Sequence, residues 1–226
     1  MSGALGSLPR VVLFDLDGTL SDSAPGILAS LRHAFEVNGL PWLDPEAQRS
    51  VLGPPFYAAL PRYVGEERVP AVVAAYRERY AAGGMYQTSV YPGIPETLRA
   101  LAEHGVRLAV ATSKPERYAE PIVAHLGLDG MFETVGGDRL DGSRGTKALV
   151  VGEVLRRLGN PDPATVLMVG DREHDVHGAR AHDVGTVGAG WGYAAPGELE
   201  NAGALAVCVT AAQLRCRLGL PGEPPA

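Results

Sequence analysis

The sequence predicts an α/β protein with a doubly wound parallel sheet and a helical domain inserted after the first strand. Short runs of continuous apolar residues recur along the chain, and helical patterns separate them. Continuous apolarity is typical of strands that are covered on both faces, as in parallel sheets. The interval between the first two runs, residues 21–88, is far longer than one crossover needs and therefore predicts an inserted domain.

The core is predicted to comprise residues 1–20 and 89–226. Its strands are expected at 10–15, 106–112, 132–137, 165–171 and 184–190, and its helices at 95–104, 116–126 and 145–158. A glycine follows each of these helices, at Gly105, Gly127 and Gly159, where it suits a left-handed cap. Strands that alternate with helices in this way favour the doubly wound architecture.

The inserted domain, residues 21–88, carries only helical patterns. They cover residues 23–39, 44–52, 54–64 and 66–84, with no convincing strand among them. A helical domain inserted into an α/β core is therefore predicted, and we refer to it as a cap.

Composition and charge exclude several classes of function. The chain has 226 residues, a net charge of -6 and no cluster of basic residues, which argues against a nucleic-acid partner. No apolar run approaches the roughly 18 residues of a membrane span, so no membrane partner and a cytoplasmic location are expected. Cys208 and Cys216 form no CxxC pair and are interpreted as reduced structural thiols. The chain has two lysines against 18 arginines, interpreted as compositional bias, and a monomer or homodimer is expected.

Polar residues follow several of the predicted strands and should meet at one edge of the sheet. They are Asp15 and Asp17 after the first strand, Thr112 and Ser113 after the second, Asp171 and Asp175 after the fourth, and Lys147 at the start of the helix before the fourth. Adjacent carboxylates repel one another, and a divalent cation compensates that repulsion. An all-oxygen set favours Mg²⁺ over zinc. Beside a lysine, such a cluster predicts a site for a small phosphorylated metabolite.

The pair of aspartates after the first strand has two separate tasks in this hypothesis. Asp15 attacks phosphorus to form an aspartyl phosphate. Asp17 protonates the leaving oxygen and then removes a proton from the water that hydrolyses the intermediate. If both aspartates only bound metal, the second would add repulsion between carboxylates without adding a function.

The motifs "FDLDGTLSDS", "VATSKPERYAEPIVAHLGL", "SRGTKALVV" and "VGDREHDVHGAR" resemble the four ordered motifs of the haloacid dehalogenase superfamily, across residues 10–190. The resemblance implies a Rossmann-like core, phosphoryl contacts from Thr112 and Lys147, and Mg²⁺ ligation by Asp15, Asp171 and the Asp17 carbonyl, with Asp175 in support. Two positions depart from the pattern, because Ser113 stands where relatives often have asparagine and Ala148 where proline often follows the lysine.

Within that superfamily the resemblance favours phosphatases over other branches. Asp17 selects phosphoryl chemistry over dehalogenation, the absence of lysine from residues 21–88 disfavours phosphonatases, and Thr19 fits mutases poorly. The stretch "RSVLGPPF" resembles that of phosphoglycolate phosphatases. A Mg²⁺-dependent phosphatase of small phosphate monoesters is therefore predicted, with Thr19, Arg49 and Gly53 as further substrate-binding candidates.

Several alternatives remain open at this point. The substrate could be a nucleotide or a sugar phosphate, and the chain could instead be a phospho-accepting signalling module or an inactive interaction protein. A zinc site using His174, His177 and His182 is disfavoured because no HExxH motif is present. The stretch "GAGWGYA", residues 188–194, lacks the register of a dinucleotide fingerprint and is interpreted as a glycine-rich loop.

Overall fold

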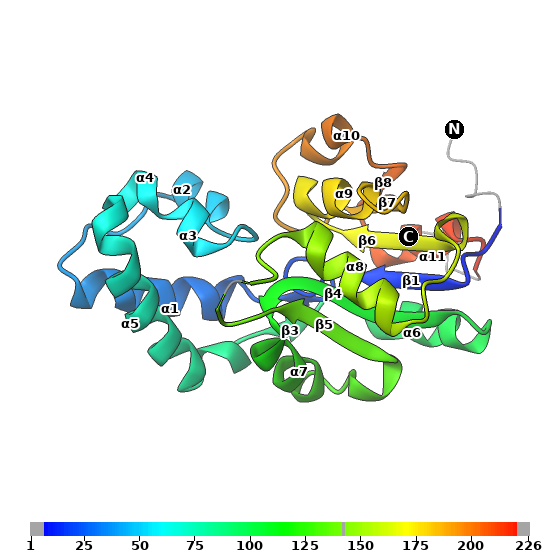
Figure 1. Ribbon diagram of the computed structural model, residues 1–226, viewed down its shortest axis with the longest axis horizontal. Coiled ribbons are helices and arrows are strands. Elements are labelled where there is room, and N and C mark those ends of the chain that lie inside the picture. Colours follow the sequence, from blue (N-terminus) through cyan, green and yellow to red (C-terminus); the bar gives the residue numbers. More distant parts are fainter. Residues whose placement is uncertain (1–6, 142, 221–226) are drawn as a thin grey trace. The chain divides into compact units, whose positions relative to one another are not determined.

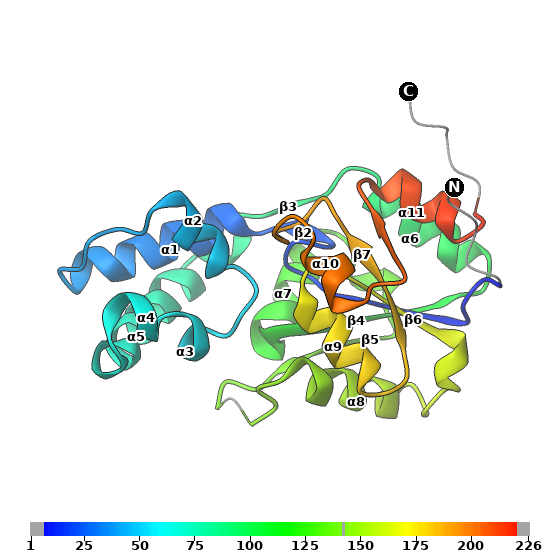
Figure 2. The same ribbon diagram turned by 90° about the horizontal axis from the view of Figure 1, so that it is seen from above.

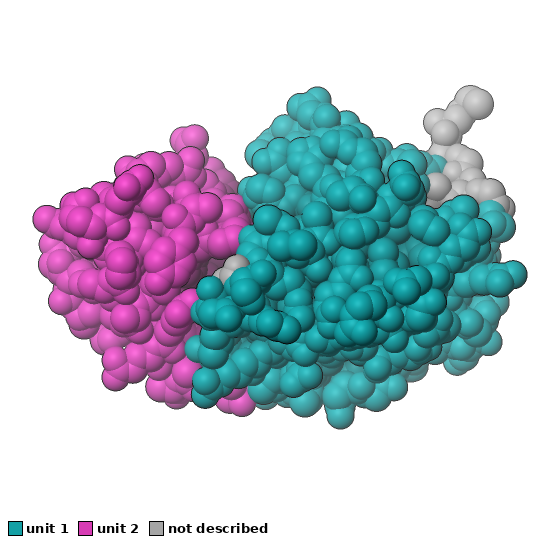
Figure 3. Space-filling model, in the orientation of Figure 1, with its two compact units in different colours: residues 1–21, 90–226 teal, residues 22–89 magenta. Residues whose placement is uncertain are grey.

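The computed structural model describes residues 7–141 and 143–220. The chain divides into two compact units, shown in different colours in Figure 3. Unit 1 combines residues 1–21 with 90–226, and unit 2 consists of residues 22–89. The two units are described separately below.

Unit 1 is built on a six-stranded parallel sheet with the order β5-β4-β1-β6-β7-β8 (Figure 1). The strands are β1 (Val11–Phe14), β4 (Arg107–Pro115), β5 (Thr134–Asp138), β6 (Val166–Gly170), β7 (Gly185–Ala189) and β8 (Ala206–Cys208). The first five correspond to the predicted strands, and β8 was not predicted. The predicted fold class, α/β with a helical insertion after the first strand, is confirmed.

Helices cover both faces of this sheet. They are α6 (Ile94–Glu103), α7 (Glu116–His125), α8 (Lys147–Arg157), α9 (Glu173–Arg180), α10 (Glu198–Ala202) and α11 (Ala211–Arg217), with short 3₁₀ turns at Asp129–Met131 and Pro163–Thr165. Figure 2 shows α6 and α11 on one side of the sheet and α8 and α9 on the other. The α8 side chains Val150, Val151 and Val154 pack into the apolar core against β1, β4 and β6.

The centre of the sheet determines where the site forms. All four residues of β1 are buried, and β1 pairs in parallel with both β4 and β6. Phe14, the last residue of β1, lies opposite Val110 of β4 and Val169 of β6. The residues that follow these strands therefore leave the sheet at the same edge.

Unit 2 is helical. Its elements are α1 (Ala24–Val37), α2 (Pro45–Ser50), α3 (Phe56–Ala59), α4 (Pro61–Val64), α5 (Val69–Ala81) and 3₁₀ turns at Glu66–Arg68 and Gly84–Tyr86. The helix predicted over 54–64 is two helices, because Pro61 begins a new one after Leu60. The packing of α1 against α5 holds the unit together. Two short strands at the boundary between the units, β2 (Ser21–Asp22) and β3 (Ser89–Val90), pair with each other.

None of the helices in the described part of the chain combines the length and apolarity needed to cross a membrane.

Candidate active site

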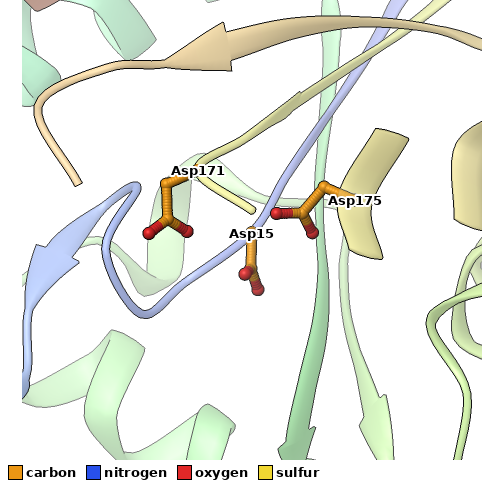
Figure 4. Close-up of side chains that lie close together, drawn as sticks. All are labelled: Asp15, Asp171 and Asp175. Carbon is orange, nitrogen blue, oxygen red and sulfur yellow. The ribbon is translucent and has the colours of Figure 1, made fainter. Parts of the chain in front are cut away.

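Three buried carboxylates converge at the edge of the sheet where β1 and β6 end (Figure 4). Each of Asp15, Asp171 and Asp175 offers an oxygen, and these oxygens all lie within 4.8 Å of one another. Asp15 directly follows β1, and Asp171 directly follows the neighbouring β6. Asp175 lies in the first turn of α9, which begins only two residues after Asp171. Adjacent parallel strands thus bring together residues that are more than 150 positions apart.

Lys147 is the cation of this cluster. It is the first residue of α8, and its Nζ lies 3.0 Å from Asp15 Oδ1 and 2.7 Å from Asp175 Oδ1. The ammonium also donates to the carbonyl oxygen of Ala111 at 3.1 Å. The side chain of Lys147 is only 4% exposed. One lysine therefore holds two of the three carboxylates in fixed positions.

A loop after β7 fixes the third carboxylate, Asp171. Its Oδ2 accepts the backbone N–H of Tyr193 at 2.8 Å, and its Oδ1 accepts the hydroxyl of Thr19 at 3.3 Å. A Cβ on Gly192 would lie 2.4 Å from the Asp171 Cβ and 2.3 Å from the Gly18 carbonyl oxygen, so only glycine fits there. The sequence interpretation gave the glycine-rich stretch 188–194 no role. Its place directly after a strand, at the same edge of the sheet, is the signal that would have found it.

Asp17 pairs with a lysine that the sequence analysis did not select. Lys114 Nζ lies 2.9 Å from Asp17 Oδ2, and the two side chains are 6% and 13% exposed. The other oxygen, Asp17 Oδ1, is buried and has no hydrogen-bond partner among the described residues. Both lysines of the chain therefore lie in the site, although arginine supplies 18 of the 20 Lys and Arg residues. That scarcity of lysine was the available signal.

The remaining predicted residues fall into two places. Thr112 and Ser113 lie near the end of β4, where Thr112 is buried and its hydroxyl accepts the backbone N–H of Lys114 at 3.2 Å. Thr19 is buried and donates to Asp171, and its contact with substrate stays a prediction. Arg49 and Gly53 belong to unit 2, where both are exposed.

Burial dominates the electrostatics of the carboxylates. Loss of hydration raises the pKa of Asp15 to about 6; Lys147 opposes this rise, while the charges of Asp175 and Asp17 add to it. Burial also raises the pKa of Asp171 well above its ordinary value, and the charges of Asp175 and Asp15 act in the same direction. For Lys147, burial favours the neutral amine, but Asp15 and Asp175 outweigh it and its pKa is raised. The lysine is therefore charged throughout the physiological range.

The cluster fits a hard divalent cation. When ionised, its three carboxylates carry three negative charges and Lys147 supplies one positive charge, which leaves a charge of about two to be neutralised. The ligands on offer are oxygens only, which suits Mg²⁺ better than zinc. No histidine belongs to a group of three or more potential metal ligands anywhere in the described ranges.

We expect Mg²⁺ to raise the melting temperature more at pH 7.5 than at pH 5. The raised pKa of Asp15 means that the folded state binds more protons than the unfolded state between pH about 4 and about 6, so this group destabilises the fold as the pH rises through that window. A bound cation replaces those protons and restores the stability that is lost as the pH rises. Thermal unfolding with and without Mg²⁺ at both pH values measures the difference. An Asp171→Asn variant should lose the Mg²⁺ effect, and a wild-type shift that is absent at pH 7.5 would contradict the cation site.

Comparison with known proteins identifies the family. The family model described as "Haloacid dehalogenase-like hydrolase" matches residues 12–189. The solved structure of a predicted phosphatase from Clostridium acetobutylicum superimposes with a TM-score of 0.88 at 34% sequence identity, covering 94% of this chain and 99% of that one. The chain belongs to the haloacid dehalogenase-like hydrolases. This confirms the predicted superfamily, which is a family of hydrolases.

Relatives within the family carry different names. A protein named tyrosine-protein kinase PtkA from Mycobacterium tuberculosis is 45% identical over 188 residues, which are 83% of this chain and 64% of PtkA. A 5'-nucleotidase from Pseudomonas aeruginosa is 37% identical, covering 90% of this chain and 93% of that protein. Phosphoglycolate phosphatase 1 from the same organism is 33% identical, covering 82% of this chain and 71% of that protein. The chain thus spans somewhat less than two thirds of the length of PtkA.

Proposed function

We propose that this chain is a Mg²⁺-dependent phosphatase that hydrolyses a small phosphate monoester, phosphoglycolate or a similar phosphorylated acid, through an aspartyl-phosphate intermediate. The observation that carries the proposal is the buried cluster of Asp15, Asp171 and Asp175 with Lys147, beside a second carboxylate at Asp17. Two relatives support it, one named a 5'-nucleotidase and the other a phosphoglycolate phosphatase.

Asp15 is the proposed nucleophile. The backbone N–H of Leu16 donates to Asp15 Oδ1 at 2.8 Å, and Lys147 contacts the same oxygen. Because both contacts fall on Oδ1, the carboxylate cannot rotate freely, and Oδ2 is the less engaged oxygen and our choice for the attack on phosphorus. Attack requires the ionised carboxylate, and the positive charge of Lys147 favours that form against the effect of burial.

The proposed reaction has two steps. In the first, the bond between Asp15 and phosphorus forms while the ester P–O bond breaks, and Asp17 gives its proton to the leaving oxygen. In the second, water attacks phosphorus, Asp17 takes the proton of that water, and the Asp15 carboxylate is released with inorganic phosphate.

Lys147, Thr112 and Ser113 are assigned to the phosphoryl oxygens. A bound Mg²⁺, held by Asp15, Asp171 and the Asp17 carbonyl with Asp175 in support, would neutralise negative charge on the phosphoryl group. Asp175 has a second task in this scheme, because it holds Lys147 and accepts the backbone N–H of Arg172 at 3.0 Å.

Release of phosphate from p-nitrophenyl phosphate tests the proposal. We expect repeated turnover in Mg²⁺, loss of activity in EDTA and recovery when Mg²⁺ is restored. A single phosphorylation per chain without turnover would indicate a phospho-accepting module. Undiminished activity after chelation, or recovery with zinc alone, would contradict the carboxylate-Mg²⁺ site.

Arg49 is the proposed contact for a substrate carboxylate. It is exposed on α2, one turn before Gly53, whose φ of 103° requires glycine, and Pro54 and Pro55 stiffen the segment that follows. A charge-assisted hydrogen bond of this kind contributes roughly 1.5 to 3 kcal/mol. The proposal assigns substrate discrimination to unit 2.

We expect Arg49→Ala to lower kcat/KM about tenfold or more for 2-phosphoglycolate and to change it little for p-nitrophenyl phosphate, which has no carboxylate. Steady-state kinetics on both substrates measure the difference. Arg68→Ala, which removes another exposed arginine of unit 2, is the matched control and should change neither value. Equal losses on both substrates would show that Arg49 acts through the folding of unit 2, and no loss would show that it is an ordinary surface residue.

A nucleoside monophosphate is the second candidate substrate, and the 37% identity to a 5'-nucleotidase over nearly the full length of both chains favours it. The relative named as a tyrosine-protein kinase is reason to include a tyrosine hydroxyl among the acceptors tested in place of water. Ranking phosphorylated acids, nucleotides and sugar phosphates by kcat/KM would decide among the substrates.

A further inference from the structure

Lys114 has no task in the reaction as described so far, although its side chain is nearly buried and pairs with Asp17. Lys114 Nζ lies 2.9 Å from Asp17 Oδ2, a charge-assisted contact between side chains that are 6% and 13% exposed. Burying two charges is costly unless the pair is well made, so a surface-type role for Lys114 does not account for it. Its position, two residues after Thr112 on β4, places it at the same edge of the sheet as the carboxylate cluster.

The two oxygens of Asp17 are in different situations. Oδ2 is held by the ammonium of Lys114, whereas Oδ1 is buried with no hydrogen-bond partner in the described part of the chain. The backbone of Asp17 is fixed as well, because it forms a parallel β-bridge with Ser21. A carboxylate held by its backbone and by one oxygen presents its other oxygen in a constant direction.

Lys114 belongs to β4, the same strand that supplies the proposed phosphoryl contacts. Its backbone N–H donates to Thr112 Oγ1 at 3.2 Å, and the register of β4 against β5 is irregular between Ala111 and Pro115. One short segment therefore connects the residue assigned to the phosphoryl group with the residue that holds the acid. A shift of this segment would move both groups together.

The choice of lysine over arginine is informative in this chain. Arginine occupies 18 of the 20 Lys and Arg positions, and the only two lysines both contact carboxylates of the site. A lysine ammonium is a compact point charge, whereas a guanidinium is a broad planar fork that contacts a carboxylate through both oxygens. At Asp17 a fork of this kind would engage Oδ1 as well as Oδ2. Lysine leaves one oxygen available.

We propose that Lys114 is a positioning residue for Asp17, holding Oδ2 so that Oδ1 faces the leaving-group oxygen and exchanges the proton with it. Lys114 keeps its own proton throughout, and no bond to it forms or breaks. The inference rests on the proposed phosphatase function and adds to it a determinant of leaving-group protonation.

The test compares esters whose leaving groups differ in their need for a proton. The value of kcat/KM reports only the steps up to departure of the leaving group, so hydrolysis of the aspartyl phosphate does not obscure it. We expect Lys114→Met to lower kcat/KM for phenyl phosphate about tenfold more than for p-nitrophenyl phosphate, because p-nitrophenolate leaves readily without protonation. Asp17→Asn should show the same pattern, and Lys114→Met should add little further loss in the Asp17→Asn background.

Two further variants control the result. Arg117→Met removes one positive charge from an exposed position on α7, three residues after Lys114. It should change kcat/KM only slightly, and by the same factor for both esters. Lys114→Arg keeps the charge but not the shape. Like Lys114→Met, it should lower kcat/KM more for phenyl phosphate than for p-nitrophenyl phosphate. Melting temperatures show whether each variant folds, and if Lys114→Met does not fold, Lys114→Gln replaces it in the same comparison.

Other outcomes would overturn the inference. Equal losses on both esters would make Lys114 a structural or general electrostatic residue. A rise in KM confined to 2-phosphoglycolate would make it a contact for the substrate carboxylate. Additive losses in the double variant would separate Lys114 from Asp17. Absence of wild-type turnover on every ester in Mg²⁺ would instead reject the proposed function, and the two failures are therefore distinguishable.

Discussion

Replacing Asp15 with asparagine is expected to abolish turnover, with a loss on the order of 10³-fold or more, while the fold is retained. The change removes the proposed nucleophile and one charged ligand of the cation but keeps the shape of the side chain. The amide oxygen of the asparagine can still accept the backbone N–H of Leu16 and face Lys147, as Oδ1 of Asp15 does. Phosphate release in Mg²⁺ measures the loss.

Stability should move in the opposite direction to activity in this variant. The pKa of Asp15 is raised to about 6, so the charged carboxylate destabilises the fold above that pH, and a neutral isostere avoids the penalty. Lys147 keeps Asp175 as its charged partner in this variant. In EDTA at pH 8, unfolding by urea should therefore show Asp15→Asn to be at least as stable as the wild type. Asp129→Asn, an exposed aspartate of unit 1, is the matched control and should remain active. A fully active Asp15→Asn protein would falsify the proposed mechanism.

Most of the core could be predicted from the sequence because buried strands appear in it as continuous apolar runs. The strand β1 is apolar at every position and ends at Asp15, so its location and the site beside it follow from one motif. Glycines after the helices gave their ends to within about two residues. The strand β8 was missed because its three residues, Ala206–Cys208, are too few to distinguish from any other apolar run.

The parts of the site that were missed depend on tertiary packing. The loop around Gly192 contributes a backbone N–H and a close approach to Asp171, and neither leaves a recognisable side-chain pattern. Lys114 lies two residues beyond the strand predicted over 106–112, and in the sequence it looks like any other charged residue; its pairing with Asp17 is evident only in the structure. Periodicity reports which residues are buried, whereas it cannot report which buried charges face one another.

Lys147 is the other position where a single change should have a large effect, because one ammonium serves both the carboxylates and the phosphoryl group. Its Nζ lies within 3.0 Å of Asp15 and within 2.7 Å of Asp175, and its side chain is 4% exposed. We expect Lys147→Met to lower kcat on the order of 10²- to 10³-fold, the usual cost of removing one preorganised group that stabilises developing negative charge. Phosphate release at saturating substrate measures this loss.

The stability of Lys147→Met should depend on pH in a defined direction. Removing one partner of a buried ion pair costs about 3 to 5 kcal/mol when the other partner stays charged. The pKa values of Asp15 and Asp171 are already raised, and losing the cation beside Asp15 raises that pKa further, so the folded variant is increasingly penalised as the pH rises. Urea unfolding in EDTA should show a large deficit in the free energy of unfolding at pH 8. The deficit should be small at pH 5, because Asp15 is then protonated and Lys147 of the wild type has itself lost one negative partner.

Arg156→Met, at a largely exposed position of the same helix, is the control and should lower the free energy of unfolding by less than about 1 kcal/mol at both pH values. A deficit for Lys147→Met that is the same at pH 5 and pH 8 would mean that its side chain acts through packing and not through its charge.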